Sequence, residues 1–206
     1  MILYLTIIFC AMLVIAALVA LAYGSGFFGV LGLAAFAVAL VMLIDATVAT
    51  IARLLPVKCA NHGSKIFKVS PKEKKFYEKL KIRLWKDKVP EIGQFTGFRK
   101  NKLDDPKSVE YLDRFLLESC YGEIGHFCSV FLGFLLVLPY GISNMWIAVS
   151  IPVAFVNALL NLPSFCILRY NSYKLEVLRK SMLKKQARDK QTAEVLQEAA
   201  AADASN

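Results

Sequence analysis

Three ionisable side chains, Glu118, Glu123 and His126, lie at the start of an apolar stretch, where such groups are costly unless they have a function. On a helix, Glu123 and His126 lie three residues apart on adjoining faces, and Glu118 lies one to two turns earlier near the same side. A histidine whose tautomer is set by a carboxylate is a common device for removing a proton from a hydroxyl group. The spacing therefore predicts a general base at His126, oriented by Glu123 or Glu118.

Two other interpretations of this cluster stay open from spacing alone. Charged groups at the mouth of a membrane span often cap helices or pair with neighbouring Lys or Arg. The two glutamates and His126 could also bind a metal together with His62, although the second-helix ExxH pair of dimetal bundles is missing. The sequence contains no glycine-rich phosphate loop, GxSxG elbow or HxxxxD box, which excludes those enzyme classes. We expect no bound metal or cofactor.

A second polar cluster follows the last apolar stretch and consists of Asn161, Arg169, Tyr170 and Asn171. Arginine and asparagine side chains at a membrane surface suit the binding of a phosphate, sugar or carboxylate group. The cluster is therefore a candidate substrate site. The alternative is a membrane anchor whose cation only contacts lipid headgroups.

The composition indicates a lipid environment, because 57% of the 206 residues are hydrophobic. The formal net charge is +9, and all 25 Lys and Arg lie within residues 53–114 and 169–190. Basic segments beside apolar spans are better explained by anionic lipid headgroups than by nucleic acid, which we exclude as a partner. The five cysteines show no metal-binding or disulfide pattern and are interpreted as small apolar residues.

The hydropathy predicts an all-α integral membrane protein with four transmembrane helices arranged as two hairpins. A bilayer core of about 30 Å needs about 20 helical residues, at about 1.5 Å per residue. The apolar runs that meet this length cover residues 2–23, 27–51, about 121–138 and about 145–162. Asp45 is the single charge of the second run, and we expect it to pair with a basic residue, a proton relay being the alternative.

The distribution of positive charge predicts the orientation. Four spans place both basic segments on one side of the cell membrane, and the excess of Lys and Arg marks that side as cytoplasmic. Both termini are then cytoplasmic. The predicted organisation is a first hairpin, a basic interfacial segment, a second hairpin, a basic cytoplasmic helix and a flexible tail, at residues 1–52, 53–120, 121–163, 164–190 and 191–206.

The basic segment contains an amphipathic helix that begins at Ser70, with Pro71 in its first turn and Glu73 at the third position. Its apolar face contains Phe76, Tyr77, Leu80, Leu84 and Trp85, and cations surround it. This pattern is typical of a helix lying in the membrane surface, or else of one packed against its neighbours on the soluble side. Trp85 and Lys86 are interpreted as an interfacial anchor, followed by a helix end at Pro90 and Gly93 and a loop over 91–105. A second helix starts at Pro106-Lys107-Ser108 and runs into the third span.

Three segments, in this order, resemble the glycosyl-diaponeurosporenoate acyltransferases, a small membrane family that completes staphyloxanthin-type carotenoids. The resemblance covers about residues 65–185. The first segment, from Trp85 to Pro90, is similar to the family's Trp-Lys-Asp/His-Lys-aliphatic-Pro. The second is similar to Glu-Thr-x-Arg-Ala-Glu-x-x-His-Trp and contains Glu118, Glu123, His126 and Phe127. The third is similar to Asn-x-Pro followed by Gln-Arg-Tyr-Asn-Arg and contains Asn161, Pro163, Arg169, Tyr170 and Asn171. Tyr121, Leu168 and Ser172 stand where the family usually has Arg, Gln and Arg.

The resemblance implies transfer of a fatty acyl group to a hydroxyl, by implication of a sugar, on a lipid-like or carotenoid-glycoside acceptor. His126 would take the hydroxyl proton, and the polar parts of the substrates would be bound by Arg169, Asn171, Asn161, Tyr170, Trp85 and Lys86. The implied donor is acyl-CoA or an acyl carrier protein, and membrane lipids surround the chain. The alternatives are a non-catalytic membrane adaptor and another small lipid-modifying enzyme of the interface, such as a methyltransferase.

Overall fold

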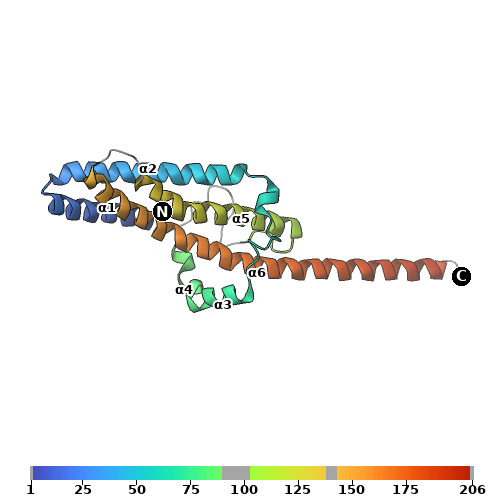
Figure 1. Ribbon diagram of the computed structural model, residues 1–206. Coiled ribbons are helices and arrows are strands. Elements are labelled where there is room, and N and C mark those ends of the chain that lie inside the picture. The colour runs from blue at the N-terminus through green and yellow to red at the C-terminus, as the bar shows by residue number, and fades with distance from the viewer. Residues whose placement is uncertain (1, 90–102, 138–142, 205–206) are drawn as a thin grey trace.

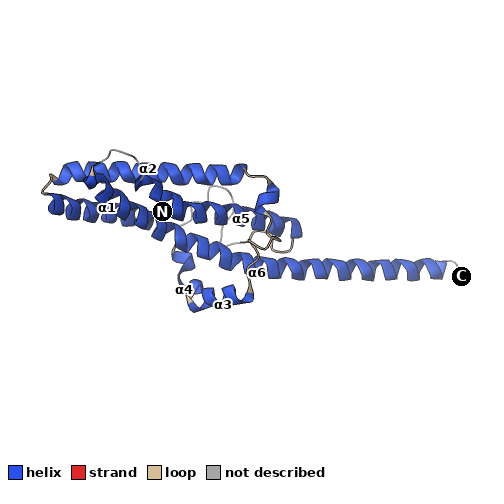
Figure 2. Ribbon diagram, in the orientation of Figure 1, coloured by secondary structure: helices blue, strands red, loops and turns tan. Residues whose placement is uncertain are grey.

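The computed structural model describes residues 2–89, 103–137 and 143–204, with side chains up to residue 197. Within these ranges every regular element is a helix and no strand occurs, which confirms the predicted all-α class (Figure 2). The α-helices are α1 Ile2–Tyr23, α2 Phe27–Leu54, α3 Pro71–Lys79, α4 Ile82–Trp85, α5 Val109–Leu132 and α6 Asn144–Ala204. Short 3-10 helices cover Val57–Ala60, Lys86–Lys88 and Gly133–Val137.

Four helices are long and apolar enough to cross a membrane: α1, α2, α5 with its 3-10 extension, and α6. Their outer faces carry large apolar side chains, for example Leu18, Phe36 and Phe155, each more than half exposed. Such a surface would be unfavourable in water and suits lipid. The chain is therefore an α-helical membrane protein with several apolar helices, as the composition predicts.

Helices α1 and α2 follow each other through a tight turn and lie side by side (Figure 1). Gly24 has a φ of +60°, which glycine adopts without strain. Alanines such as Ala16, Ala34 and Ala37 are fully buried between the helices and let their backbones approach closely. The start of α6 closes this core, because the Trp146 indole donates to the Leu136 carbonyl oxygen at 2.9 Å.

Helix α5 runs antiparallel to α6 and packs along its own length against the middle part of α6 (Figure 1). Successive contacts show the register, because Ser129 meets Asn157, His126 meets Asn161 and Glu123 meets residue 169. Ser108 caps α5 by accepting a hydrogen bond from the Tyr111 backbone N–H, next to the helix start predicted at residues 106–108. Two rows of polar side chains, one on each helix, are thereby brought face to face.

The last helix corrects two expectations. A span ending near Leu162 and a separate helix after Pro163 are predicted, but α6 continues through Pro152 and Pro163. Each proline removes one backbone hydrogen bond, and packing against neighbouring helices compensates for this loss. The tail predicted to be flexible from residue 191 is also helical as far as Ala204, because alanine has the highest helix propensity. This end of α6 projects far beyond the other helices (Figure 1).

The amphipathic helix predicted to begin at Ser70 is divided into α3 and α4, which lie beside α6 (Figure 1). Ser70 is the predicted N-cap and accepts from the Glu73 backbone N–H at 3.1 Å. The break is at Lys81, whose φ of 52° is left-handed. The predicted helix end at Pro90 and Gly93, most of the predicted loop over 91–105, and the turn after residue 138 lie outside the described residues.

Candidate functional site

Helix α1 serves as a reference for depth in the membrane. Its 22 residues give a length of about 33 Å, close to the thickness of a bilayer core. The Tyr4 hydroxyl donates to the Leu160 carbonyl oxygen at 2.9 Å, so the first turn of α1 lies beside this part of α6. Polar side chains from α2, α5 and α6 meet at the same level. The later residues of α6 therefore lie progressively beyond the end of α1.

Asp45 of α2 is the acidic member of this intramembrane polar group. Its Oδ1 accepts from Asn157 Nδ2 at 3.3 Å and its Oδ2 from Asn161 Nδ2 at 3.1 Å. The prediction that Asp45 pairs with a basic residue is wrong for the described chain, in which no Lys or Arg lies within salt-bridge distance of Asp45. The cations lie beyond the apolar parts of the helices, and neutral amides are cheaper to bury than an ammonium group.

His126 contacts α6 through its Nδ1 atom, which lies 2.8 Å from Asn161 Oδ1. The amide nitrogen of Asn161 is directed at Asp45 and at the Asn157 carbonyl and amide oxygens, so the amide oxygen must face the imidazole. An amide oxygen only accepts hydrogen bonds, so the Nδ1 atom carries the proton and the Nε2 atom keeps its lone pair. In the part of the chain that the structure describes, the hydrogen bond of this imidazole is made by Nδ1, and none is made by Nε2. This arrangement can accept a proton at Nε2.

Glu123 takes part in a second polar group, further along α6 and beyond the level of α1. The carboxylate is 2% exposed and accepts from Ser172 Oγ at 2.8 Å and from Arg169 Nη1 at 3.1 Å. Arg169 also forms a bidentate pair with Glu73, with distances of 2.8 and 2.9 Å. The same guanidinium donates to the carbonyl oxygens of Ile66 and Phe67. The Nε, Nη1 and Nη2 groups of Arg169 thus all donate to the protein. With Glu73 and Glu123 they form a clamp that holds α3 and its preceding loop against α5 and α6.

The expected contact between His126 and a glutamate does not occur. Glu123 faces the next polar level of α6, and Glu118 lies 3.6 Å from Arg53, at the end of α2. On an antiparallel helix pair, residues of α5 three positions apart meet different turns of α6, and each finds a partner of its own. The structure therefore places Asn161 where a glutamate is predicted to orient the imidazole.

The other candidate substrate-binding residues are spread over the same face of α6. Tyr170 is buried and packs in one cluster with Tyr77, Ile82 and Trp85, which brings two predicted segments together. Trp85 donates from its indole to the Leu80 carbonyl oxygen at 3.0 Å. Asn171 and Lys86 are half-buried. Because the donors of Arg169 are engaged by the protein, its geometry favours a structural clamp, and its predicted role in binding substrate stays a prediction.

The metal alternative gains no support from the arrangement. No group of three or more His, Cys, Asp or Glu side chains among the described residues is placed to hold a metal ion. His62 lies 3.2 Å from Glu176 and 3.7 Å from Asp113, on the side of α6 that contacts the start of α5. It is separate from His126, which contacts Asn161, and from Glu123, which contacts Arg169.

Glu73 shows how the clamp around Arg169 depends on charge. Desolvation raises the pKa of Glu73, but hydrogen bonds from Arg169 and Tyr77 outweigh it, so that this pKa lies below its ordinary value. Burial of Tyr77 and the neighbouring Glu73 carboxylate raise the pKa of the Tyr77 hydroxyl. This hydroxyl therefore stays protonated and donates to Glu73.

A pH dependence of stability follows from the lowered pKa of Glu73. A carboxylate with a lowered folded pKa contributes stability that is complete above its unfolded pKa and is lost as the pH falls through the folded value. We therefore expect the melting temperature to fall as the pH drops below about 4.5, the ordinary value. In Glu73→Gln this fall should be smaller than in the wild type. Glu78→Gln, on the same helix but in an exposed pair with Lys74, should leave the acid dependence unchanged. If the melting temperature fell equally with decreasing pH in the wild type and in both variants, the clamp would be contradicted.

Gly133 permits the packing of the amide network. A Cβ at this position would lie 2.8 Å from Asn157 Nδ2 and 3.3 Å from a Val41 methyl group. We expect Gly133→Ala to displace the Asn157 amide from Asp45 and to destabilise the protein by about 1–3 kcal/mol, as overpacking does. Gly32→Ala is the matched control, because nothing lies within 4 Å of its added Cβ and alanine favours the helix. Thermal unfolding of both variants in detergent tests this. Equal melting temperatures would show that the network does not need the glycine.

Several residues of the site escape sequence reasoning. Asn157 has a visible signal, because it lies four residues before Asn161 on one face of an apolar helix. Ser172 stands where the resembled family has arginine and donates instead to Glu123. Glu73 fits its predicted helix start, but its side chain leaves α3 to bind Arg169. Only the register between α6 and the loop before α3 places this last pair together.

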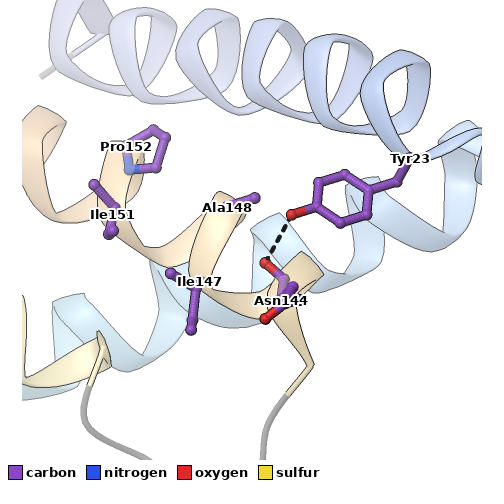
Figure 3. Close-up of a pocket in the computed structure, with 6 residues that line it drawn as sticks. All are labelled: Tyr23, Asn144, Ile147, Ala148, Ile151 and Pro152. Atoms are coloured by element: carbon purple, nitrogen blue, oxygen red, sulfur yellow. Dashed lines mark hydrogen bonds between the residues drawn. The ribbon is translucent and has the colours of Figure 1, made fainter.

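An open pocket lies at the other end of the helices, where α1 ends and α6 begins (Figure 3). Tyr23 donates to the Asn144 carbonyl oxygen at 3.2 Å at its edge, and its floor consists of Ile147, Ala148, Ile151 and Pro152. It contains no ionisable group except the tyrosine. The described polar groups with acid–base chemistry are at the opposite end, around His126 and Glu123.

Comparison with known protein families matches residues 63–181 to the family of glycosyl-4,4'-diaponeurosporenoate acyltransferases. The matched stretch is more than half of the chain and contains α3, α4, α5 and the first part of α6. It includes His126, Asn161, Glu123 and the arginine clamp, whereas α1 and α2 precede it. Neither the curated proteins nor the solved structures that were compared gave a significant match. The chain belongs to the family of glycosyl-4,4'-diaponeurosporenoate acyltransferases, whose name describes an acyl transfer of carotenoid biosynthesis.

Proposed function

We propose that this protein transfers a fatty acyl group to a sugar hydroxyl of a carotenoid glycoside or similar lipid-like acceptor, with His126 as the general base. The observation that carries this proposal is the contact between His126 Nδ1 and Asn161 Oδ1, because it leaves Nε2 able to accept a proton. The family match supports the acyl transfer, and the apolar helices support a lipid-soluble substrate.

The proposed reaction is a direct transfer. His126 Nε2 takes the proton of the acceptor hydroxyl while its oxygen attacks the acyl carbonyl of a thioester donor. The bond from the carbonyl carbon to sulfur breaks, and the imidazolium returns the proton to the leaving thiolate. The donor would be acyl-CoA or an acyl carrier protein, and the enzyme returns to its starting state without a bound cofactor. General base catalysis of this kind contributes about 10² to 10⁴-fold, and positioning supplies the rest.

The level of His126 suits this chemistry. His126 lies near the level of the first turn of α1. A lipid-like substrate whose apolar chain lies among the helices could therefore place its polar end beside the imidazole. Phe127, Phe131 and Phe165 form an aromatic group next to it, with ring centroids 5.1 and 5.6 Å apart. These rings would contact the apolar part of the acceptor or of the acyl chain.

The membrane orientation that fits the proposal has two hairpins, with both termini in the cytoplasm. The clamp, α3, α4 and the projecting part of α6 then lie on the cytoplasmic side, where thioester donors occur. On α3, α4 and the turn between them the side chains of Phe76, Leu80 and Leu84 are exposed, and lysines lie between them. We propose that this face contacts the membrane surface, in agreement with the amphipathic pattern.

An adaptor function is the second candidate, and the projection of α6 favours it. From residue 184 to residue 197 every side chain is exposed, and several are basic, so that this part of the helix could bind a partner. An adaptor should be insensitive to conservative changes at His126, whereas charge reversal within residues 72–88 should release the partner. An acyltransferase should respond in the opposite way.

The experiment for the proposed function compares the lipids and pigments of cells that express the protein with those of cells carrying an empty vector. Both strains should contain a carotenoid glycoside as acceptor. Mass spectrometry should reveal a species heavier than the glycoside by one fatty acyl group only when the protein is present. Identical profiles, with the protein folded in the membrane, would favour the adaptor.

A further inference from the structure

We propose that Asp45 is a positioning residue of the reaction: through Asn161 it holds His126 in the tautomer that leaves Nε2 free to accept a proton. The inference rests on the proposed role of His126 and deepens it. It adds a residue of α2, which lies outside the matched residues 63–181, to a site otherwise built from α5 and α6. Asp45 does not touch the substrate in this proposal and acts only through the amide.

The first argument is the location of Asp45. It is the single charged residue in the first 52 residues of the chain, and the next charge on its helix is Arg53, two turns later at the end of α2. An ionisable group at this depth destabilises the helix in the membrane unless it has a specific role. None of the ion pairs of the described chain includes it, so electrostatic pairing does not explain its presence.

The second argument is the direction of the amides. If the Asn161 side chain turned over, its oxygen would face the Asp45 oxygens, and two acceptors would repel each other at about 3.1 Å. Asp45 therefore selects the orientation in which the Asn161 oxygen faces the imidazole. Asn157 supports this choice, because its own amide nitrogen donates to Asp45 and to the Ser129 carbonyl oxygen. Three helices thus set the position of one proton.

The third argument is that the position is closely packed. Asn157 and Asn161 are 7% and 6% exposed, and Ser129 is buried as well. At Gly125, one turn from Ser129, an added Cβ would lie 4.0 Å from the Ala49 Cα atom, so α2 and α5 approach closely here. Such packing leaves the amides little freedom to turn over without a change in Asp45.

The direct test is the tautomer of His126, measured by NMR of protein labelled with ¹⁵N-histidine in lipid nanodiscs. The chain has two histidines, so a His62→Gln background leaves a single imidazole to observe. Spectra are recorded above the ordinary histidine pKa of about 6.5, so that the ring is neutral. With Asp45 present we expect the proton on Nδ1. With Asp45→Asn a neutral amide accepts both orientations of Asn161, and we expect a mixture of the two tautomers.

Two variants calibrate this measurement. Asn161→Leu removes the contact with His126 and shows the spectrum of an imidazole without its partner. Thr47→Val lies on the same helix as Asp45 and loses an exposed hydroxyl that bonds only to the Leu43 carbonyl oxygen. It should keep the tautomer of the wild type. An unchanged tautomer in Asp45→Asn, together with a changed one in Asn161→Leu, would overturn the role of Asp45.

Kinetics give a second readout once turnover is established. Asp45→Asn should lower kcat by between about tenfold and about 10²-fold, less than the loss of the base itself, with KM within about twofold. A change in KM alone would contradict a positioning role. The tautomer measurement needs no turnover. A tautomer that depends on Asp45 in a protein without transferase activity would therefore refute the proposed function and leave only the role of Asp45 in setting the tautomer.

Discussion

His126→Gln is expected to lower the rate of acyl transfer by about 10² to 10⁴-fold while leaving the fold unchanged. Glutamine can still donate an N–H to Asn161 Oδ1, so the contact that holds the network is retained. It cannot accept a proton at neutral pH, and the acceptor hydroxyl would have to attack without a base. The loss should appear in kcat, because the imidazole acts mainly in the transition state.

The chain supplies a matched control for this variant. His62→Gln makes the same change at the second histidine, which lies between Asp113 and Glu176 and away from the proposed site. It should retain the turnover of the wild type. Melting temperatures of both variants show whether they are folded. Full turnover in a folded His126→Gln protein would exclude His126 as the base.

Arg169→Met is expected to cause the largest loss of stability. Breaking a buried ion pair by removing one partner costs about 3–5 kcal/mol, because the remaining charge stays desolvated. Here Glu123, 2% exposed, would keep only the hydroxyl of Ser172, and Glu73 would lose both charge-assisted bonds. For a chain of this size the change corresponds to a fall in melting temperature on the order of 10 °C. A thiol-reactive dye can follow unfolding through the buried Cys120 once the exposed Cys10 and Cys59 have been replaced by serine.

Lys174→Met is the control for the arginine variant. It removes a cation from the same helix, where Lys174 is exposed and its Nζ lies 4.5 Å from the centre of the Tyr170 ring. We expect a loss of less than about 1 kcal/mol, as for other exposed cations. The double variant Arg169→Met with Glu123→Met should recover part of the stability, since no unpaired buried carboxylate remains there. An equal melting temperature for Arg169→Met and Lys174→Met would show that Arg169 is not a structural clamp.

The parts of the fold that depend on local sequence are predictable. Four apolar stretches give helices long enough for a membrane, Ser70 caps the helix that it is predicted to cap, and α5 begins directly after its predicted start at residues 106–108. Helix propensity and hydropathy act over a few turns, so the sequence alone contains this information. The same reasoning underestimates α6, because the packing that lets it continue through Pro163 comes from other helices.

The composition of the site is partly predictable, but its pairing is not. His126 and Asn161 are both recognised from the sequence as candidates in different clusters, and the structure places them in contact. The predicted carboxylate partner is replaced by an amide, because the register of α5 against α6 decides which residues meet. Asp45 needs a third helix to acquire its two partners, and no spacing along the chain reveals that.

The most direct test of the central claim uses the purified protein in nanodiscs, a carotenoid glycoside and a fatty acyl-CoA or acyl carrier protein with a ¹³C-labelled acyl chain. We predict that mass spectrometry detects the labelled acyl group on the sugar of the acceptor, at a rate that falls by at least about 10²-fold in His126→Gln. Absence of labelled product with both donors, from a wild-type protein whose melting curve shows a folded state, would contradict the assignment as an acyltransferase.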